Sequence, residues 1–134
     1  MSIRVEMEVV KILVADDSKE VREQMLNLLV KLGHTDITMA ENGKSAIDKI
    51  INEIDKYLPF DLIILDQNTS VLDGMEVLES LRVIPQYEKT PVIIMTETTD
   101  KDFIVKAIET GANGFLPKPI DGKVLKQEIK KLIK

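Results

Sequence analysis

Four polar residues come just after short apolar runs that have the length and composition of buried β-strands. They are Asp17, Asp66, Thr96 and Lys118, which follow the runs at residues 12–15, 62–65, 92–95 and 114–117. Open parallel sheets bind their ligands at the carboxyl ends of the strands. We therefore expect two acids, a hydroxyl and an amine to meet at one edge of a sheet and to form a polar site.

The acidic residues predict a metal site. Asp16 and Asp17 are adjacent, and Asp66 is expected at the end of a neighbouring strand. Like charges at close range raise pKa values and destabilise a fold unless a cation neutralises them. One Asp at a helix start is often only an N-cap, but capping does not explain three acids at one edge. Sites with few carboxylate ligands suit Mg²⁺, which keeps several waters and often also binds a phosphate.

Asp66 is the best candidate for a nucleophile. A carboxylate can attack phosphorus and form an aspartyl-phosphate. The Thr96 hydroxyl can donate a hydrogen bond to one phosphoryl oxygen, and the Lys118 ammonium can pair with another. Taken alone, Thr96 is an ordinary strand-end threonine and Lys118 an ordinary surface lysine. Their shared place at the strand ends favours phosphoryl chemistry.

The composition restricts the class of protein. A chain of 134 residues suits one domain with one core. It has no run of about 18 apolar residues, and its first eight residues carry acids where a signal peptide is apolar, so we expect no membrane insertion. Cysteine is absent, which favours a cytoplasmic protein without disulfides. The net charge of −5 argues against direct nucleic-acid binding.

Strand-like and helix-like segments alternate along the chain, which is typical of βαβ units. A weaker strand is expected at residues 36–40, and the helical stripes of apolar residues begin at Val21, Ala46, Met75, Phe103 and Val124. Because crossovers between parallel strands are right-handed, helices should cover both faces. We predict an α/β fold with a doubly wound, five-stranded parallel sheet and five helices. Residues 1–9 alternate apolar and polar side chains, as an N-terminal tail or an extra strand would.

Five motifs make the chain resemble the receiver domain of two-component response regulators, close to the single-domain regulators of the CheY type. They are Leu-Val-Ala-Asp-Asp-Ser (13–18), Leu-Ile-Ile-Leu-Asp (62–66), Leu-Asp-Gly-Met-Glu (72–76), Pro-Val-Ile-Ile-Met-Thr (91–96) and Gly-Ala-Asn-Gly-Phe-Leu-Pro-Lys-Pro (111–119). The resemblance implies a receiver domain over residues 10–134. It also implies a flavodoxin-like fold with strand order 2-1-3-4-5.

The resemblance assigns roles around the acidic cluster. It implies that Asp66 is the phosphoacceptor and that the carboxylates of Asp17 and Asp66 bind Mg²⁺. Asp16 would hold a coordinated water, and the backbone carbonyl of Asn68 would supply a further ligand. Lys118 would pair with the phosphoryl group.

The switch residues are implied in the same way. Thr96 would move toward the phosphoryl group while Phe115 turns inward, and the bond before Pro119 would be cis. Three further residues would tune the lifetime of the aspartyl-phosphate: Asn68, Glu97 and Thr98.

Two positions near the site depart from the pattern of the family. Ser70 stands where relatives usually carry Pro, so we expect a less rigid loop after Asp66. Glu97 follows Thr96, where a small residue is usual. A long acid there could shield the site or repel an incoming phosphoryl group.

The implied function is a signalling switch rather than an enzyme, because the chain would catalyse only its own phosphorylation and dephosphorylation. A histidine kinase or a phosphotransfer protein would donate the phosphoryl group. The surface of the fourth helix, fifth strand and fifth helix would then bind a downstream protein, with a homodimer as an open alternative.

Three other functions compete with this interpretation. A degenerate receiver that acts as a constitutive interaction module is supported mainly by Glu97. A phosphatase of the haloacid dehalogenase type needs a second acid, but Asn68 stands two residues after Asp66. A flavodoxin-like FMN carrier needs backbone donors after the first strand, where Asp16 and Asp17 would repel the phosphate.

Overall fold

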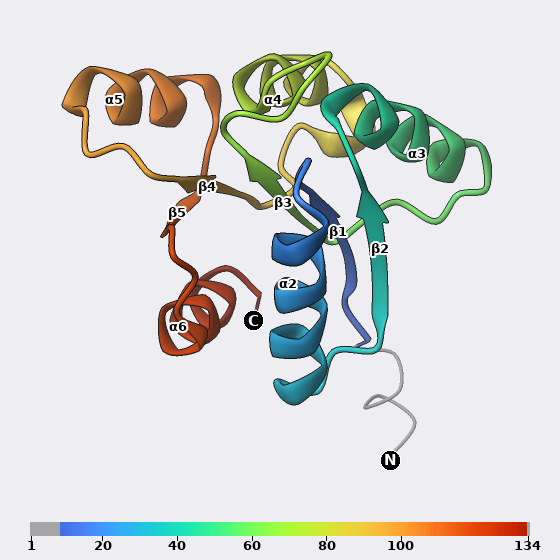
Figure 1. Cartoon of the computed structure of the whole chain (residues 1–134). Coiled ribbons are helices and arrows are strands. Elements are labelled where there is room, and N and C mark those ends of the chain that lie inside the picture. The colour runs from blue at the N-terminus through green and yellow to red at the C-terminus, as the bar shows by residue number, and fades with distance from the viewer. Residues whose placement is uncertain (1–8, 134) are drawn as a thin grey trace.

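The computed structural model of this protein describes residues 9–133 (Figure 1). The predicted tail or extra strand at residues 1–9 lies outside the described residues except for Val9, which is exposed and belongs to no strand. That prediction therefore stays open.

A five-stranded sheet forms the centre of the fold. Its strands are β1 (Lys11–Ala15), β2 (Asp36–Ala40), β3 (Leu62–Asp66), β4 (Val92–Thr96) and β5 (Gly114–Pro117). All neighbouring pairs are parallel, and the order is β2-β1-β3-β4-β5. The predicted doubly wound sheet and its strand order are confirmed.

Two site residues lie inside strands rather than just after them. Asp66 pairs with Met95 in the β3–β4 ladder, and Thr96 pairs with Pro117 in the β4–β5 ladder. The apolar runs predicted strands that ended one residue earlier. Backbone pairing extends each strand through its polar residue, so both side chains are fixed by the sheet itself.

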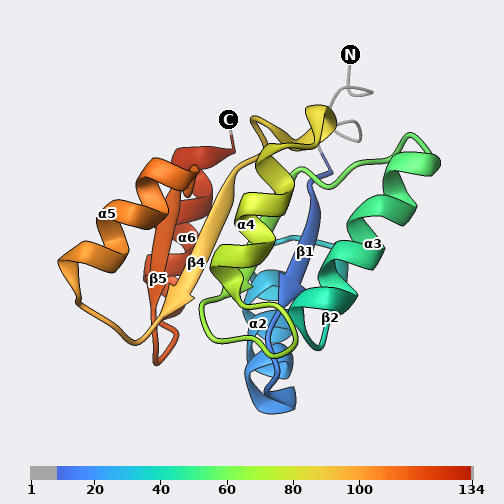
Figure 2. The same ribbon diagram turned by 90° about the horizontal axis from the view of Figure 1, so that it is seen from above.

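Within residues 9–133 the chain forms five α-helices and one short 3-10 helix. They are α2 (Lys19–Lys31), α3 (Gly43–Asp55), α4 (Gly74–Arg82), η1 (Pro85–Tyr87), α5 (Lys101–Thr110) and α6 (Gly122–Leu132). Helices α2 and α6 lie on one face of the sheet, while α3, α4 and α5 cover the other (Figures 1 and 2). The predicted fourth and fifth helices are α5 and α6. None of these helices is long and apolar enough to cross a bilayer.

The sheet separates two apolar cores, because successive strand residues point to opposite faces. On β3, Ile63 and Leu65 pack toward α3, α4 and α5, while Leu62 and Ile64 pack toward α2 and α6. All four side chains are fully buried, as is usual in a parallel sheet covered on both sides. Burial of one such side chain contributes about 1.5–3 kcal/mol, which gives the polar edge a rigid base.

The helix ends agree with the signals in the sequence. Gly33 and Gly111 follow α2 and α5 with φ of 94° and 120°, a backbone region that glycine adopts at little cost. The helix starts are capped by Ser18, Asn42, Asp73, Asp100 and Asp121. Four of these caps, at Ser18, Asp73, Asp100 and Asp121, follow loops that carry candidate site residues, so each of these loops is also fixed where the helix begins.

Candidate functional site

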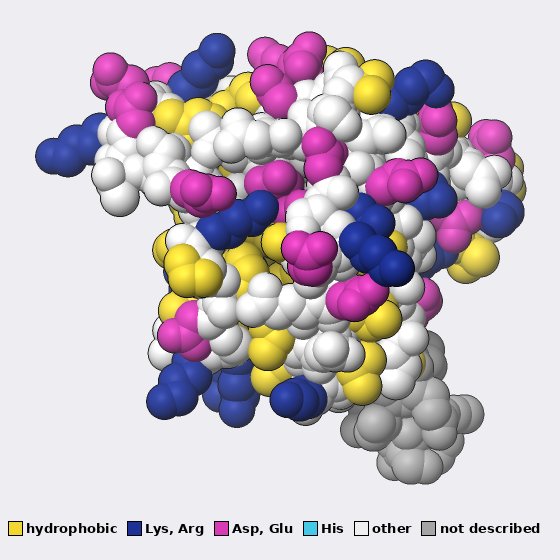
Figure 3. Space-filling view, viewed as in Figure 1, with side chains coloured by type: hydrophobic (Ala, Val, Ile, Leu, Met, Phe, Trp, Pro, Cys, Tyr) yellow, Lys and Arg dark blue, Asp and Glu magenta, His cyan; other side chains and the backbone are white. Residues whose placement is uncertain are grey.

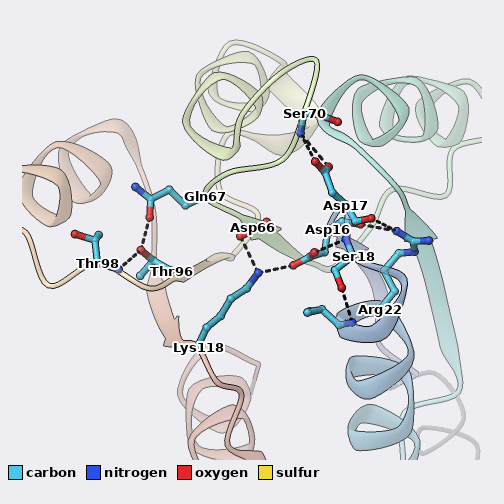
Figure 4. A network of polar contacts seen from close by, with 11 residues as sticks. Asp16, Asp17, Ser18, Arg22, Asp66, Gln67, Ser70, Thr96, Thr98 and Lys118 are labelled. Carbon is cyan, nitrogen blue, oxygen red and sulfur yellow. Dashed lines mark hydrogen bonds and ion pairs between the residues drawn. The ribbon is translucent and has the colours of Figure 1, made fainter.

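The ammonium of Lys118 joins two carboxylates at the carboxyl ends of the strands (Figure 4). Its Nζ lies 2.8 Å from Asp16 Oδ2 and 3.1 Å from Asp66 Oδ1. The side chains of Asp16, Asp66 and Lys118 are 2%, 10% and 16% exposed. The group is therefore largely shielded from water, although Asp66 can still be reached from one side.

Backbone contacts beyond the strands position two members of this group. Asp16 N–H donates to the carbonyl of Ala40 at 3.1 Å, so the β1–β2 pairing continues one residue past β1. Asp16 Oδ1 accepts from Ser18 N–H at 2.8 Å, which turns the chain into α2. Lys118 N–H donates to the carbonyl of Thr96 at 3.0 Å, so the lysine is held beside the end of β4.

The charges in the site shift the pKa values of both partners. Burial raises the pKa of the Asp66 carboxyl, and the charge of Asp16 raises it further, against the lowering effect of Lys118. Burial alone would lower the pKa of Lys118, but its hydrogen bonds and charge interactions with Asp16 and Asp66 outweigh burial and raise it. The lysine is thus firmly cationic, while the negative charge on Asp66 is only partly offset.

Asp17 turns away from this group. Its Oδ1 and Oδ2 accept from the backbone N–H of Ser70 at 2.9 and 3.0 Å, and Figure 4 shows the carboxylate directed at the loop between β3 and α4. The guanidinium of Arg22 donates to the carbonyls of Asp16 and Asp17 at 2.7 and 3.1 Å. The backbone of both acids is therefore fixed, while their side chains have different partners.

The three acids do not form one metal-binding group in this structure. Within residues 9–133, no three His, Cys, Asp or Glu side chains are arranged to hold a metal ion. Lys118 neutralises part of the charge that the sequence suggested a metal would neutralise. The predicted ligand set of Asp16, Asp17, Asp66 and Asn68 therefore stays a prediction.

Thr96 is held by two neighbours. Its buried hydroxyl donates to the side-chain oxygen of Gln67, and Thr98 N–H donates to Thr96 Oγ1 at 3.0 Å. Sequence reasoning missed Gln67. The contact depends on the strand register, which pairs Asp66 with Met95 and so brings Gln67, just after β3, beside Thr96.

The other predicted residues lie around this centre. Asn68 and Glu97 are exposed and Thr98 is half-buried. A hollow of about 320 Å³ lined by Gln67, Asn68, Met75 and Phe103, among others, opens beside the site toward α4 and α5.

The segment around β5 carries two more predicted residues. Phe115 is partly buried against the core on the α5 side, and its N–H donates to Glu128 Oε1 at 3.2 Å. The Lys118–Pro119 peptide bond is cis. The aromatic ring and the lysine therefore lie at opposite ends of one short strand and its loop.

Acidic side chains predominate near the centre of the molecular face in Figure 3, where basic side chains lie among them. This view is the same as that of Figure 1, in which β1, β3 and α2 lie behind that central area. Charged side chains of both signs therefore surround the area in front of these elements.

Comparison with known proteins gives the family. Residues 12–130 match the response regulator receiver domain, and the chain belongs to this family. It is similar to a chemotaxis protein CheY homologue of Campylobacter jejuni, at 32% identity over 123 residues that cover 92% of each chain. It is also similar to chemotaxis protein CheY of Pseudomonas aeruginosa, at 31% identity over 91% of this chain and 94% of the relative.

Solved structures show the same fold. Chemotaxis protein CheY4 of Vibrio cholerae superposes with a TM-score of 0.82 and 28% identity, covering 92% of this chain and 98% of that chain. The receiver domain of sensor histidine kinase PA1611 from Pseudomonas aeruginosa, which has a magnesium ion in its active-site cleft, shares the fold. Its TM-score is 0.80 at 22% identity, with 92% and 97% of the two chains covered. The protein is a CheY-like receiver domain of two-component signalling.

Proposed function

We propose that this receiver accepts a phosphoryl group on Asp66 from a histidine kinase or a phosphotransfer protein. The observation that supports the proposal best is Lys118 Nζ at 3.1 Å from Asp66 Oδ1, at the carboxyl ends of the strands. An Asp66 oxygen attacks phosphorus, the bond between phosphorus and the donor histidine nitrogen breaks, and the imidazole keeps that electron pair and takes up a proton. Asp66 has to be ionised for this attack.

Lys118 prepares Asp66 for the reaction. Its ammonium already lies on the attacking carboxylate, so it can follow the charge onto the phosphoryl oxygens without a large movement. Electrostatic groups that are positioned in advance are usually the largest contribution to such reactions. Asp16 holds the other side of the ammonium at 2.8 Å and so fixes its direction.

The donor set fits Mg²⁺. Three carboxylates and one backbone carbonyl offer only oxygen atoms, and Lys118 alone does not balance the charges of Asp16, Asp17 and Asp66. Oxygen ligands with remaining negative charge suit a hard divalent cation. Asp17, Asp66 and the carbonyl of Asn68 would hold the ion, with Asp16 acting through a water. The bound ion would neutralise charge on the transferring phosphoryl group.

The signal then passes from Thr96 to the surface of α5, β5 and α6. A phosphoryl oxygen would compete with Gln67 for the Thr96 hydroxyl, and the new charge-assisted bond would favour a second position of the loop. Phe115 would link Thr96 to this surface, because its side chain lines a surface hollow of about 500 Å³ together with Ile108 on α5 and Val124 on α6. Ile108 is 55% exposed there, which suits a downstream protein or a second copy of the chain.

Intact-mass analysis after incubation with Mg²⁺ and a small phosphodonor tests the proposal. The wild type should gain the mass of one phosphoryl group, and Asp66→Ala should gain none. Asp48→Ala is the matched control, because Asp48 is an exposed acid on α3 that pairs with Lys44, away from the strand ends. A wild type that gains no mass would support the constitutive interaction module, for which the exposed Glu97 beside Thr96 is the specific observation.

A further inference from the structure

The carboxylate of Asp17 is held by a backbone donor. Both of its oxygens lie at nearly equal distances, 2.9 and 3.0 Å, from the nitrogen of Ser70. The Ser70 N–H is therefore shared between the two oxygens of the Asp17 carboxylate, while the carboxylates of Asp16 and Asp66 contact Lys118 (Figure 4). Asp17 is the one predicted metal ligand among the three acids that has no contact with Lys118.

The loop that carries this N–H is fixed on both sides. The carbonyl of Ser70 accepts from Gly43 N–H at 3.2 Å and from Leu72 N–H at 2.8 Å. The buried Thr69 hydroxyl donates to the carbonyl of Leu72 at 2.6 Å. These bonds point the Ser70 N–H outward at Asp17, so the donor is a built part of the loop between β3 and α4.

We propose that the Ser70 N–H is a latch that positions Asp17 away from the metal site and so weakens the binding of Mg²⁺. The inference rests on the proposed function, because it concerns the same metal site. A cation shared with Asp66 needs the Asp17 oxygens directed toward the β3 end, where Lys118 now bridges Asp16 and Asp66. Asp17 must therefore leave the Ser70 N–H before it can take up that role.

The Ser70 N–H and Mg²⁺ compete for the Asp17 carboxylate, and this competition depends on whether residue 70 has a backbone N–H. Any amino acid other than proline supplies an N–H there, and proline supplies none. The Ser70 hydroxyl has no part in the contact, because the donor to Asp17 is the backbone nitrogen. The latch is therefore removed by Ser70→Pro and kept by Ser70→Ala.

Calorimetric titration of Mg²⁺ into the whole chain compares these two variants without any phosphorylation step. A hydrogen bond to a charged group stabilises more than one between neutral groups, and here it must be broken before Asp17 can bind the metal. We therefore expect Ser70→Pro to bind Mg²⁺ about tenfold more tightly than the wild type, which corresponds to about 1.4 kcal/mol. Ser70→Ala should stay within about twofold of the wild type. A folded Ser70→Pro protein that binds no more tightly than Ser70→Ala overturns the inference.

A second measurement uses the wild type, because proline also restricts the residue before it and Ser70→Pro can fail to fold. Amide hydrogen exchange followed by NMR reports the Ser70 N–H directly. The amide should exchange faster at saturating Mg²⁺, since its acceptor has left. The control is the Glu76 amide, which Asp73 Oδ1 accepts at 2.9 Å in the α4 cap and which should not change. A Ser70 amide that stays equally protected at saturating Mg²⁺ overturns the latch.

The outcomes separate this inference from the proposed function. If Mg²⁺ binds equally to all three proteins while Asp66 is still phosphorylated, the latch alone is wrong. If Mg²⁺ binds to none of them and no phosphoryl group is accepted, both are wrong. Tighter binding to Ser70→Pro only, together with faster exchange of the wild-type amide, supports the latch, whether or not Asp66 is then found to be phosphorylated.

Discussion

Lys118 Nζ lies 3.1 Å from Asp66 Oδ1, although β4 separates β3, which carries Asp66, from β5, which Lys118 follows directly. The contact exists because β5 lies next to β4, and the Lys118 N–H donates to the carbonyl of Thr96 at the end of β4. The long lysine side chain then reaches back across the end of β4. Most of what we expect of this protein follows from that contact.

Neutralising Asp66 should stabilise the metal-free fold at neutral pH. Burial first, and the charge of Asp16 second, raise the pKa of Asp66 above its ordinary 3.8. An acid with a raised pKa favours folding only below its unfolded pKa and loses that contribution as pH rises through the folded value. Asp66→Asn should therefore unfold at a higher urea concentration than the wild type at pH 7.

This difference should shrink as the pH falls toward 4, because wild-type Asp66 then becomes neutral as well. Asp48→Asn is the control, since its exposed side chain should give little change at either pH. A gain in stability for Asp66→Asn that is the same at pH 7 and pH 4 would contradict the electrostatic explanation.

Removal of the Lys118 ammonium should make the fold depend on a divalent cation. Lys118→Ala leaves Asp16 and Asp66 without their shared partner, which we expect to cost about 1–3 kcal/mol of unfolding free energy. Mg²⁺ should then raise the melting temperature of Lys118→Ala more than that of the wild type. Equal shifts in melting temperature for the two proteins would show that Lys118 and the metal do not neutralise the same charges.

Gln67 should restrain the switch hydroxyl. Gln67→Ala removes the acceptor of the Thr96 hydroxyl, and a hydrogen bond of about 1 kcal/mol corresponds to about a fivefold change in rate. We expect phosphorylation by a small donor at saturating Mg²⁺ to become faster by about that factor. In a Thr96→Val background the same substitution should have no effect, since the partner is gone. An equal acceleration in both backgrounds would place the effect of Gln67 elsewhere.

Three residues on the rim should set the lifetime of the aspartyl-phosphate. Asn68 and Glu97 are exposed beside the site, and Thr98 contacts Thr96 through its N–H. We expect Asn68→Ala, Glu97→Ala and Thr98→Ala each to change the decay rate after the donor is removed, without abolishing phosphorylation. Intact-mass measurements over time follow the decay. Unchanged lifetimes in the Asn68 and Thr98 variants would count against this role.

The sequence predicted the sheet, and it placed the polar residues at one edge of that sheet, because apolar strand runs and their polar ends are local signals. Asp66 and Thr96 were placed at the right edge, one residue outside their strands, since a hydrophobic pattern does not show where backbone pairing stops. Lys118 was expected to meet the acids, and it does.

The side-chain partners were harder to predict than the positions. The repulsion argument predicted three clustered carboxylates, but Asp17 takes the N–H of Ser70 instead. That donor is a backbone group, which every residue except proline has. The sequence therefore shows only that the donor is present, not that Asp17 binds it. The contact of Gln67 with Thr96 depends on the side-chain direction at the strand ends, which an apolar run does not specify.

Peptide mapping of the phosphorylated protein tests the central claim most directly. Borohydride reduces an acyl phosphate to an alcohol, so the modified aspartate can be located by tandem mass spectrometry after digestion. Incubation with Mg²⁺ and a phosphodonor should place the reduced residue at Asp66, and Lys118→Ala should give much less of it. Modification at any other residue, or none in the wild type, would contradict the account.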